Sequence, residues 1–215
     1  MSVLLAKSEW MRAHMPANRK RGNRKIFGRA VNDASYVVDP GKQTGAPPCP
    51  AYKCWMRMLI RCYSESFLCR NPTYVGVSVC DSWLLFSNFR EWWALHVVDD
   101  WELDKDLLHL GNTVYSPDNC VFVPKWLNRF LNDSAARRGE FPIGVYYHKR
   151  DRKFRAQLSL GEGPQITIGN FDTPDAAYGA WLSAKLNHAL SKKTEMDAID
   201  VRISPNVMRR IETMK

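Results

Sequence analysis

The feature that most constrains the fold is the alternation of polar and apolar residues in the segment Lys153-Phe-Arg-Ala-Gln-Leu158. Successive side chains of a β-strand point to opposite faces, so this segment predicts a strand with one apolar face and one polar face. Downstream, Thr173 followed by Pro174 is typical of a helix start, and an Ala-rich sequence follows. The pattern predicts an antiparallel sheet with one face packed on a helix.

The polar face of this predicted sheet carries groups that can hydrogen-bond to DNA. Lys153, Arg155 and Gln157 alternate with the apolar residues, and Tyr146 and His148 of the preceding strand fall on the same side. Such side chains reach base edges in a groove or the phosphates beside it. We therefore predict double-stranded DNA as the partner, and an incidentally basic surface is the alternative. The candidate DNA-binding residues, including the cations of the connecting turn, are Tyr146, His148, Lys149, Arg150, Arg152, Lys153, Arg155 and Gln157.

The basic excess lies at the two ends of the chain. Residues 1–46 hold 9 basic and 3 acidic side chains, residues 47–140 hold 10 and 11, and residues 141–215 hold 12 and 8. Neutralisation of phosphates by Lys and Arg supplies most non-specific affinity for nucleic acid. The distribution favours a polyanionic partner held at both ends, and a solubilising surface charge is the simpler alternative.

The middle of the chain is predicted to be helical and rich in aromatic residues. Apolar side chains recur at helical spacing over residues 55–62, and a second helix is expected over residues 83–98 after an Asp81-Ser82 cap. Most of these aromatic side chains are expected to be core residues.

The first of these helices also carries a basic stripe. Lys53, Arg57 and Arg61 stand at positions i, i+4 and i+8, and therefore share one helix face. A phosphate backbone and plain solvent explain this face equally well.

Cysteine usage and hydropathy bear on the cellular compartment. We expect no apolar signal segment and no membrane-spanning segment. Because disulfides form mainly in secreted proteins, we therefore expect reduced thiols and a cytoplasmic location. The four residues between Cys49 and Cys54 match structural zinc spacing weakly, so buried free thiols are favoured. The six cysteines are Cys49, Cys54, Cys62, Cys69, Cys80 and Cys120.

A dense run of carboxylates precedes a short turn, strand and helix. Oxygen ligands of this kind suit Mg²⁺ or Mn²⁺, and phosphodiester hydrolysis uses a Lewis acid at the scissile phosphate. A solvated surface loop is the alternative. The carboxylates are Asp99, Asp100, Glu102, Asp104 and Asp106.

The spacing of Asp104-Lys-Asp106, Asn119 and Asn128 resembles the HNH endonucleases, especially free-standing phage and homing-type members. The resemblance implies a ββα-metal core that holds one divalent ion, Mg²⁺ or Mn²⁺. By the same resemblance Asp104 is a metal ligand, Asn119 braces the metal loop, and Asn128 is the helical ligand.

The sequence departs from that family at the residue expected to act as the catalytic base. Lys105 stands where the resemblance places the catalytic histidine, which must be neutral to accept a proton from water. A lysine serves as a base only where its surroundings favour the neutral amine, and the flanking carboxylates favour the ammonium. His109 is the substitute candidate. Aligning Asp106 with the metal ligand instead would put Leu107 at the base position and remove the chemistry.

The C-terminal half resembles the AP2 DNA-binding domain over about residues 141–190. The motifs that carry the resemblance are Gly144-Val145, Lys153 to Gln157, Ile168 to Phe171 and Thr173 to Trp181, in that order. The resemblance implies a three-stranded antiparallel sheet packed on one helix, with the exposed sheet face in the major groove.

These observations predict an α+β chain: an aromatic-rich helical segment with an HNH-like ββα core, followed by an AP2-like sheet and helix. The expected domains are a basic arm over residues 1–46, a nuclease core over 47–140, a DNA-binding domain over 141–190 and a tail over 191–215. The predicted function is DNA hydrolysis in the cytoplasm of a phage-infected bacterium. The alternatives are an inactive DNA-binding scaffold, and a phage protein that inhibits or redirects a host enzyme through residues 52–93.

Overall fold

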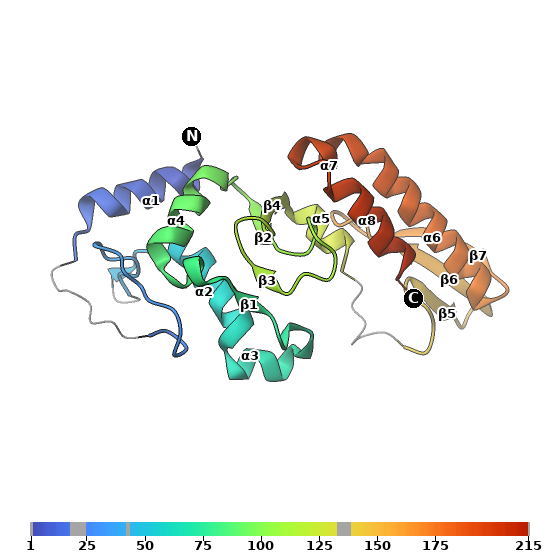
Figure 1. Ribbon diagram of the computed structural model, residues 1–215. Helices are drawn as coiled ribbons and strands as arrows, with labels where there is room; N and C mark the ends of the chain where they lie inside the picture. Colours follow the sequence, from blue (N-terminus) through green and yellow to red (C-terminus); the bar gives the residue numbers. More distant parts are fainter. Residues whose placement is uncertain (1, 18–24, 42–43, 133–138, 215) are drawn as a thin grey trace. The chain divides into compact units, whose positions relative to one another are not determined.

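The computed structural model describes residues 2–17, 25–41, 44–132 and 139–214, which form a mixed α+β structure with eight α-helices (Figure 1). The chain divides into two compact units. The first comprises Met1–Asp106 and Gly111–Phe122, and the second comprises Leu107–Leu110 and Val123–Lys215. Of the predicted basic arm over residues 1–46, residues 18–24 and 42–43 lie outside the described residues.

Helices α2 and α4 supply the core of the first unit. The apolar face predicted over residues 55–62 is confirmed, because Trp55, Met58, Leu59 and Cys62 are all buried. Trp55 also donates its indole N–H to a backbone carbonyl at 2.7 Å, which satisfies its polar atom inside the core. The helices of this unit are α1 (Val3–His14), α2 (Pro50–Tyr63), α3 (Glu65–Arg70) and α4 (Phe86–His96), with 3₁₀ turns η2 (Pro72–Tyr74) and η3 (Asp81–Leu84).

The predicted start of α4 is wrong. Asp81 and the residues after it form the 3₁₀ turn η3, and the α-helix begins at Phe86. Its first turn is held by Asp33, whose carboxylate accepts from the backbone N–H and the hydroxyl of Ser87 at 2.8 and 2.6 Å. Capping by a residue far away in sequence leaves no local signal, which is why the start was misplaced.

Helix α1 is held in a similar way by a distant carboxylate. Asp99 accepts from the Ser2 hydroxyl and from the backbone N–H groups of Val3 and Leu4, at 2.7, 2.6 and 3.0 Å. These hydrogen bonds lower the pKa of Asp99. The largest contribution comes from the Leu4 N–H, and smaller ones come from the Ser2 hydroxyl and the Val3 N–H. One member of the predicted acidic run therefore serves as a helix cap.

The strands of this half form two small sheets. Strand β1 (Ser78–Val79) is parallel to β3 (Val114–Tyr115). Strand β2 (Trp101–Asp104) pairs with β4 (Val121–Pro124), and helix α5 (Lys125–Phe130) follows β4 directly.

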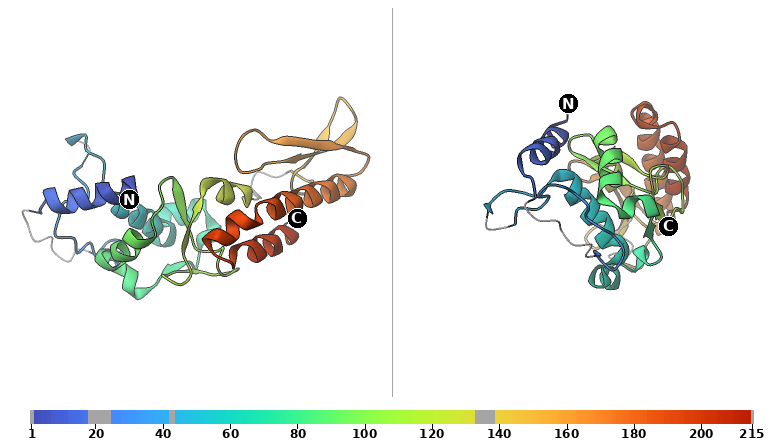
Figure 2. Two further views of the ribbon diagram at one scale, coloured as in Figure 1. Left: turned by 90° about the horizontal axis from the view of Figure 1, so that it is seen from above. Right: turned by 60° about the vertical axis from the view of Figure 1, so that its left-hand side comes forward.

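The second unit contains the predicted three-stranded antiparallel sheet with a helix on one face. Strands β5, β6 and β7 are hydrogen-bonded in that order, and α6 covers one face of them while α8 runs along α6 (Figure 2). The predicted cap is confirmed, because the Thr173 hydroxyl accepts from the N–H of Ala176 at 3.2 Å. The bounds are β5 (Val145–His148), β6 (Lys153–Leu158), β7 (Ile166–Phe171), α6 (Pro174–Ser191), α7 (Lys193–Ile199) and α8 (Ile203–Glu212).

A close approach at Gly144 fixes the sheet on α6. Gly144 has a φ of +76°, and a Cβ there would lie 2.1 Å from a ring atom of Trp181. Trp181 and Ala177 are buried beneath the sheet, as predicted. Glycine is therefore required by backbone conformation and by packing alike.

No helix within the described ranges has both the length and the apolarity needed to cross a membrane.

Candidate functional site

The face of the β5–β6–β7 sheet opposite α6 is polar across all three strands. Tyr146 of β5 is paired with Arg155 of β6, which is paired with Asn170 of β7. His148 is paired with Lys153 in the next outward row. A register shift between Ala156 and Gln157 separates these rows from the last one, and brings Gln157 opposite Thr167. The prediction that the outward side chains of β5 and β6 share one face of the sheet is thus confirmed. These side chains are Tyr146, His148, Lys153, Arg155 and Gln157.

Hydrogen bonds join these side chains into a layer. The Arg155 guanidinium donates from Nε to Oδ1 of Asn170 at 2.8 Å, and its Nη1 lies 3.5 Å from the Tyr146 hydroxyl. Gln157 donates to the Thr167 hydroxyl at 3.3 Å. These lateral hydrogen bonds restrict the side-chain conformations of the layer.

One carboxylate organises the centre of this layer. Asp151 lies in the β5–β6 turn, and its Oδ2 accepts from Nη2 of Arg155 at 2.9 Å and from Nδ2 of Asn170 at 3.3 Å. Nδ1 of His148 lies 3.0 Å from the same oxygen. Three of the five N–H donors of Arg155 are thus engaged within the layer, one each on Nε, Nη1 and Nη2, and two are left for an outside partner.

The turn between β5 and β6 presents three cations to solvent. Lys149, Arg150 and Arg152 are all exposed, and Arg152 has a positive φ of 49°, which closes the turn. Lys153 pairs with Asp172 at the same end of the sheet. Exposed cations that flank a polar sheet face are suited to phosphates on either side of a groove.

The loop after β2 is closed by a buried lysine. Lys105 is 7 % exposed, and its ammonium donates to Oδ1 of Asp106 at 2.5 Å and to the backbone carbonyl of Asn112 at 3.0 Å. It also lies 5.9 Å from the ring centroid of Tyr115. An ammonium that holds these acceptors has no lone pair to offer to water, so the geometry favours a structural role for Lys105.

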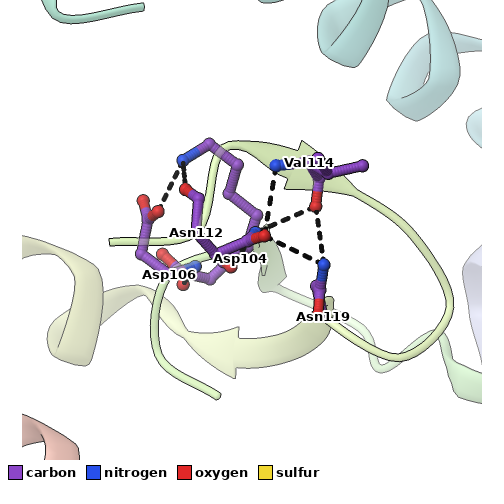
Figure 3. Close-up of polar contacts among 6 residues, drawn as sticks. Asp104, Asp106, Asn112, Val114 and Asn119 are labelled. Atoms are coloured by element: carbon purple, nitrogen blue, oxygen red, sulfur yellow. Dashed lines mark hydrogen bonds and ion pairs between the residues drawn. The ribbon is translucent and has the colours of Figure 1, made fainter. Parts of the chain in front are cut away.

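Two asparagines complete this loop. Asn112 donates to the carbonyls of Lys105 and Val114 at 2.8 and 2.9 Å, and its Oδ1 accepts from the Val114 N–H at 3.1 Å (Figure 3). Asn119 donates to Oδ1 of Asn112 at 2.9 Å and to the Val114 carbonyl at 3.2 Å. The Asp106 N–H donates to Oδ1 of Asp104 at 2.7 Å. Asn119 thus holds Asn112 and Val114, and Asn112 in turn holds the Lys105 carbonyl. The predicted role of Asn119 beside a metal stays a prediction.

The other residues predicted for a nuclease site lie in the second unit. Asn128 is on α5, and His109 is in the short segment Leu107–Leu110. Nε2 of His109 lies 3.3 Å from Nη1 of Arg202. A guanidinium only donates, so the histidine nitrogen accepts, and this contact occupies the lone pair that a base would use. The roles of Asp104, Asn128 and His109 in catalysis stay predictions.

Oxygen donors are the groups of this region that could hold a divalent ion. In the first unit Asp104 stands at the end of β2 and Asp106 two residues later, each already accepting a hydrogen bond. Across the described ranges, no three side chains drawn from His, Cys, Asp and Glu converge as a metal site. A divalent ion would therefore have to take amide, carbonyl or water oxygens as well.

Comparison of the chain with models of protein families, with curated proteins and with solved structures gave no match.

The sequence prediction missed several residues of both sites. Asn170 and Thr167 belong to the polar sheet face but lie three residues apart, so strict alternation predicts opposite faces for them. Only the register shift in the β6–β7 pairing brings both to this face, and the sequence carries no clear signal of that shift. Asp151 had no such signal, since an acidic residue among turn cations reads as a solubilising charge. Asn112 was missed because its partners come from both sides of the loop.

Proposed function

We propose that this chain binds double-stranded DNA and inserts the polar face of the β5–β6–β7 sheet into the major groove. The observation that carries the proposal is the layer of laterally held donors around Arg155 on the face opposite α6. A major groove admits strands, and its base edges present distinct donor and acceptor patterns that such a layer can read. The AP2-like resemblance and the cationic turn support the same assignment.

The residues divide by the contact that each is suited to make. Arg155 and Gln157 lie mid-sheet, and a guanidinium or amide there can pair with base edges. Lys149, Arg150 and Arg152 lie in the turn and are suited to phosphates, which set affinity without reading sequence. The cytoplasm of a phage-infected bacterium is the compartment that we propose, on the phage-type resemblance of the sequence alone.

Duplex binding measured by fluorescence anisotropy at several salt concentrations tests this division. We expect Arg155→Ala with Gln157→Ala to remove preference among duplexes at about 1–3 kcal/mol per lost base contact. Each turn variant, such as Arg150→Ala, is expected to lower the salt slope by about 1 without changing the preference. Lys193→Ala on α7 removes an exposed cation away from the sheet and serves as the matched control. Duplex affinity indifferent to all the sheet and turn variants would refute the proposal.

Metal-dependent DNA hydrolysis is the second candidate, supported by one specific observation. Paired strands β2 and β4 lead directly into α5, which is the ββα order implied by the HNH resemblance, and Asn119 braces the intervening loop. On this candidate the HNH resemblance predicts Asp104 and Asn128 as ligands of Mg²⁺ or Mn²⁺.

Cleavage of supercoiled plasmid with each metal tests hydrolysis. Nicking that disappears in Asp104→Ala and in Asn128→Ala would support a nuclease. Its loss in Lys105→Ala or in His109→Ala would identify the base only in a variant that circular dichroism shows to be folded, because Lys105 also holds the loop. Duplex binding without cleavage in either metal would leave DNA binding as the function. Inhibition of a host enzyme without DNA affinity would overturn both candidates.

A further inference from the structure

A cavity in the first unit combines a basic wall with an aromatic floor. Its volume is about 220 Å³, below the roughly 300–1,000 Å³ of typical small-molecule sites. A cavity of this size admits a single flat group and leaves the rest of a ligand outside. It is lined by Leu4, Pro50, Lys53, Cys54, Arg57, Met58, Arg61, Trp93, Val97, Trp101, Glu102, Leu103 and Phe122.

The basic wall is the stripe of cations on α2. Lys53, Arg57 and Arg61 are spaced one helical turn apart, about 6 Å along the axis. Arg61 is half-buried. Lys53 and Arg57 are exposed, and within the described ranges neither has an ion-pair partner. With Glu102 as the one carboxylate of the lining, the wall keeps a net positive charge.

The opposite side of the cavity is apolar and aromatic. Trp93 is buried, Trp101 and Leu103 of β2 are half-buried, and Phe122 of β4 adds a third ring to the lining. Burial raises the pKa of the Cys54 thiol to about 12, so this side chain is neutral there. Flat apolar rings beside a row of cations are the features of sites that stack single bases and track a backbone.

We propose that this cavity binds one nucleotide of an unpaired DNA strand, with its base on the Trp101 side and the neighbouring phosphates on Lys53 and Arg57. The proposal extends the DNA-binding function proposed above and rests on it for the chemistry of the ligand. Regularly spaced cations fit an anion that repeats along a chain. The aromatic side fits the base of each nucleotide. An acidic peptide has no flat ring at a fixed spacing from its charges.

The test is binding of a fluorescein-labelled oligothymidylate to the full chain, followed by anisotropy at several salt concentrations. Lys53→Ala with Arg57→Ala is expected to lower the salt slope by about 1.4, since each single-strand phosphate contact contributes about 0.7. Lys7→Ala with Arg70→Ala removes two exposed cations from α1 and α3 of the same unit. This control carries the same net charge, and its slope is expected to equal that of wild type.

The aromatic side has its own variants. Trp101→Ala is expected to weaken oligothymidylate binding by roughly 5- to 150-fold, the equivalent of one base stack, whereas Trp101→Phe keeps a ring and most of the affinity. Circular dichroism establishes that each variant is folded. If Trp101→Ala does not fold, the Trp101→Phe and Lys53/Arg57 measurements still decide the proposal.

Two results would overturn the nucleotide site. One is an equal salt slope in the Lys53/Arg57 variant and in the Lys7/Arg70 control. The other is labelled polyglutamate that binds as tightly as the oligonucleotide and depends equally on Lys53 and Arg57. Arg155→Ala with Gln157→Ala separates this site from the sheet. Loss of duplex binding in that variant with oligothymidylate binding intact would support two sites. A wild-type chain that binds the single strand but no duplex would refute the sheet proposal alone, and one that binds duplex only would refute the cavity.

Discussion

Replacing Lys105 by methionine tests whether an internal ammonium holds the loop after β2. Methionine keeps the unbranched apolar stem and removes the charge that bonds to Asp106 and to the Asn112 carbonyl. The Lys105 side chain is 8 % exposed and that of Asp106 is 37 % exposed. The carboxylate can therefore be rehydrated in the variant, whereas the carbonyl loses a donor in a half-buried place.

The magnitude follows from these two partners. The half-solvated ion pair contributes about 0–1 kcal/mol, as exposed pairs do. A carbonyl left without its donor costs about 1–3 kcal/mol. We expect Lys105→Met to lower the free energy of unfolding by about 2 kcal/mol, within a range of about 1–4 kcal/mol.

Urea unfolding followed by tryptophan fluorescence measures this change. Lys7→Met on α1 replaces an exposed lysine and is expected to stay within about 0.5 kcal/mol of wild type. Lys105→Met combined with Asp106→Asn completes a double-mutant cycle, in which coupling of at least about 0.5 kcal/mol is expected for side chains in contact. A Lys105→Met variant as stable as the Lys7→Met control would refute the structural role.

Three further predictions concern other parts of the chain. Gly144→Ala is expected to destabilise the sheet on α6 by more than about 1 kcal/mol, because strain adds to the clash with the α6 tryptophan; Gly163→Ala, with a similar φ and open space, is the thermal-unfolding control. The pKa of Asp99 is lowered in the folded state, so its stabilisation of α1 is present above the ordinary carboxyl pKa and lost as pH falls through the lowered value. The protection factors of the α1 amides, which correct the exchange rates for their intrinsic pH dependence, should therefore fall on acidification in wild type, and Asp99→Asn should abolish that fall. Iodoacetamide at pH 8 is expected to modify exposed Cys69 well before Cys54, whose thiol pKa is raised by burial, and mass spectrometry of the peptides would show the order.

Local patterns in the sequence were sufficient for the elements that those patterns alone define. The alternation of Lys153 to Leu158 placed the polar and apolar faces of β6 correctly, and the Thr173-Pro174 pair located the start of α6. The spacing over residues 55–62 identified the buried face of α2. In each case the physical signal repeats within a few residues, so no knowledge of the tertiary structure was needed.

Contacts between distant residues account for what the sequence could not provide. Asp33 holds α4 and Asp99 holds α1, and neither acceptor lies near the helix it caps. The position of Lys105 depends on a loop that returns to place the Asn112 carbonyl over its ammonium. From sequence alone, Asp99 was assigned to a metal-binding run of carboxylates and Lys105 to a catalytic position. The residues near them in sequence do not indicate their actual partners.

The buried cations also change how the charge of the chain bears on DNA binding. Lys185 is 2 % exposed, donates to the carbonyl of Phe130 at 2.5 Å and lies 4.1 Å from the centroid of that ring. Lys105 is likewise internal, so both cations stabilise the protein interior and are unavailable to phosphates. The formal charge of +9 therefore overstates the charge presented to a polyanion. The proposed DNA contact is therefore best tested at the exposed cations of the β5–β6 turn and of α2 and at the half-buried residues of the polar sheet face.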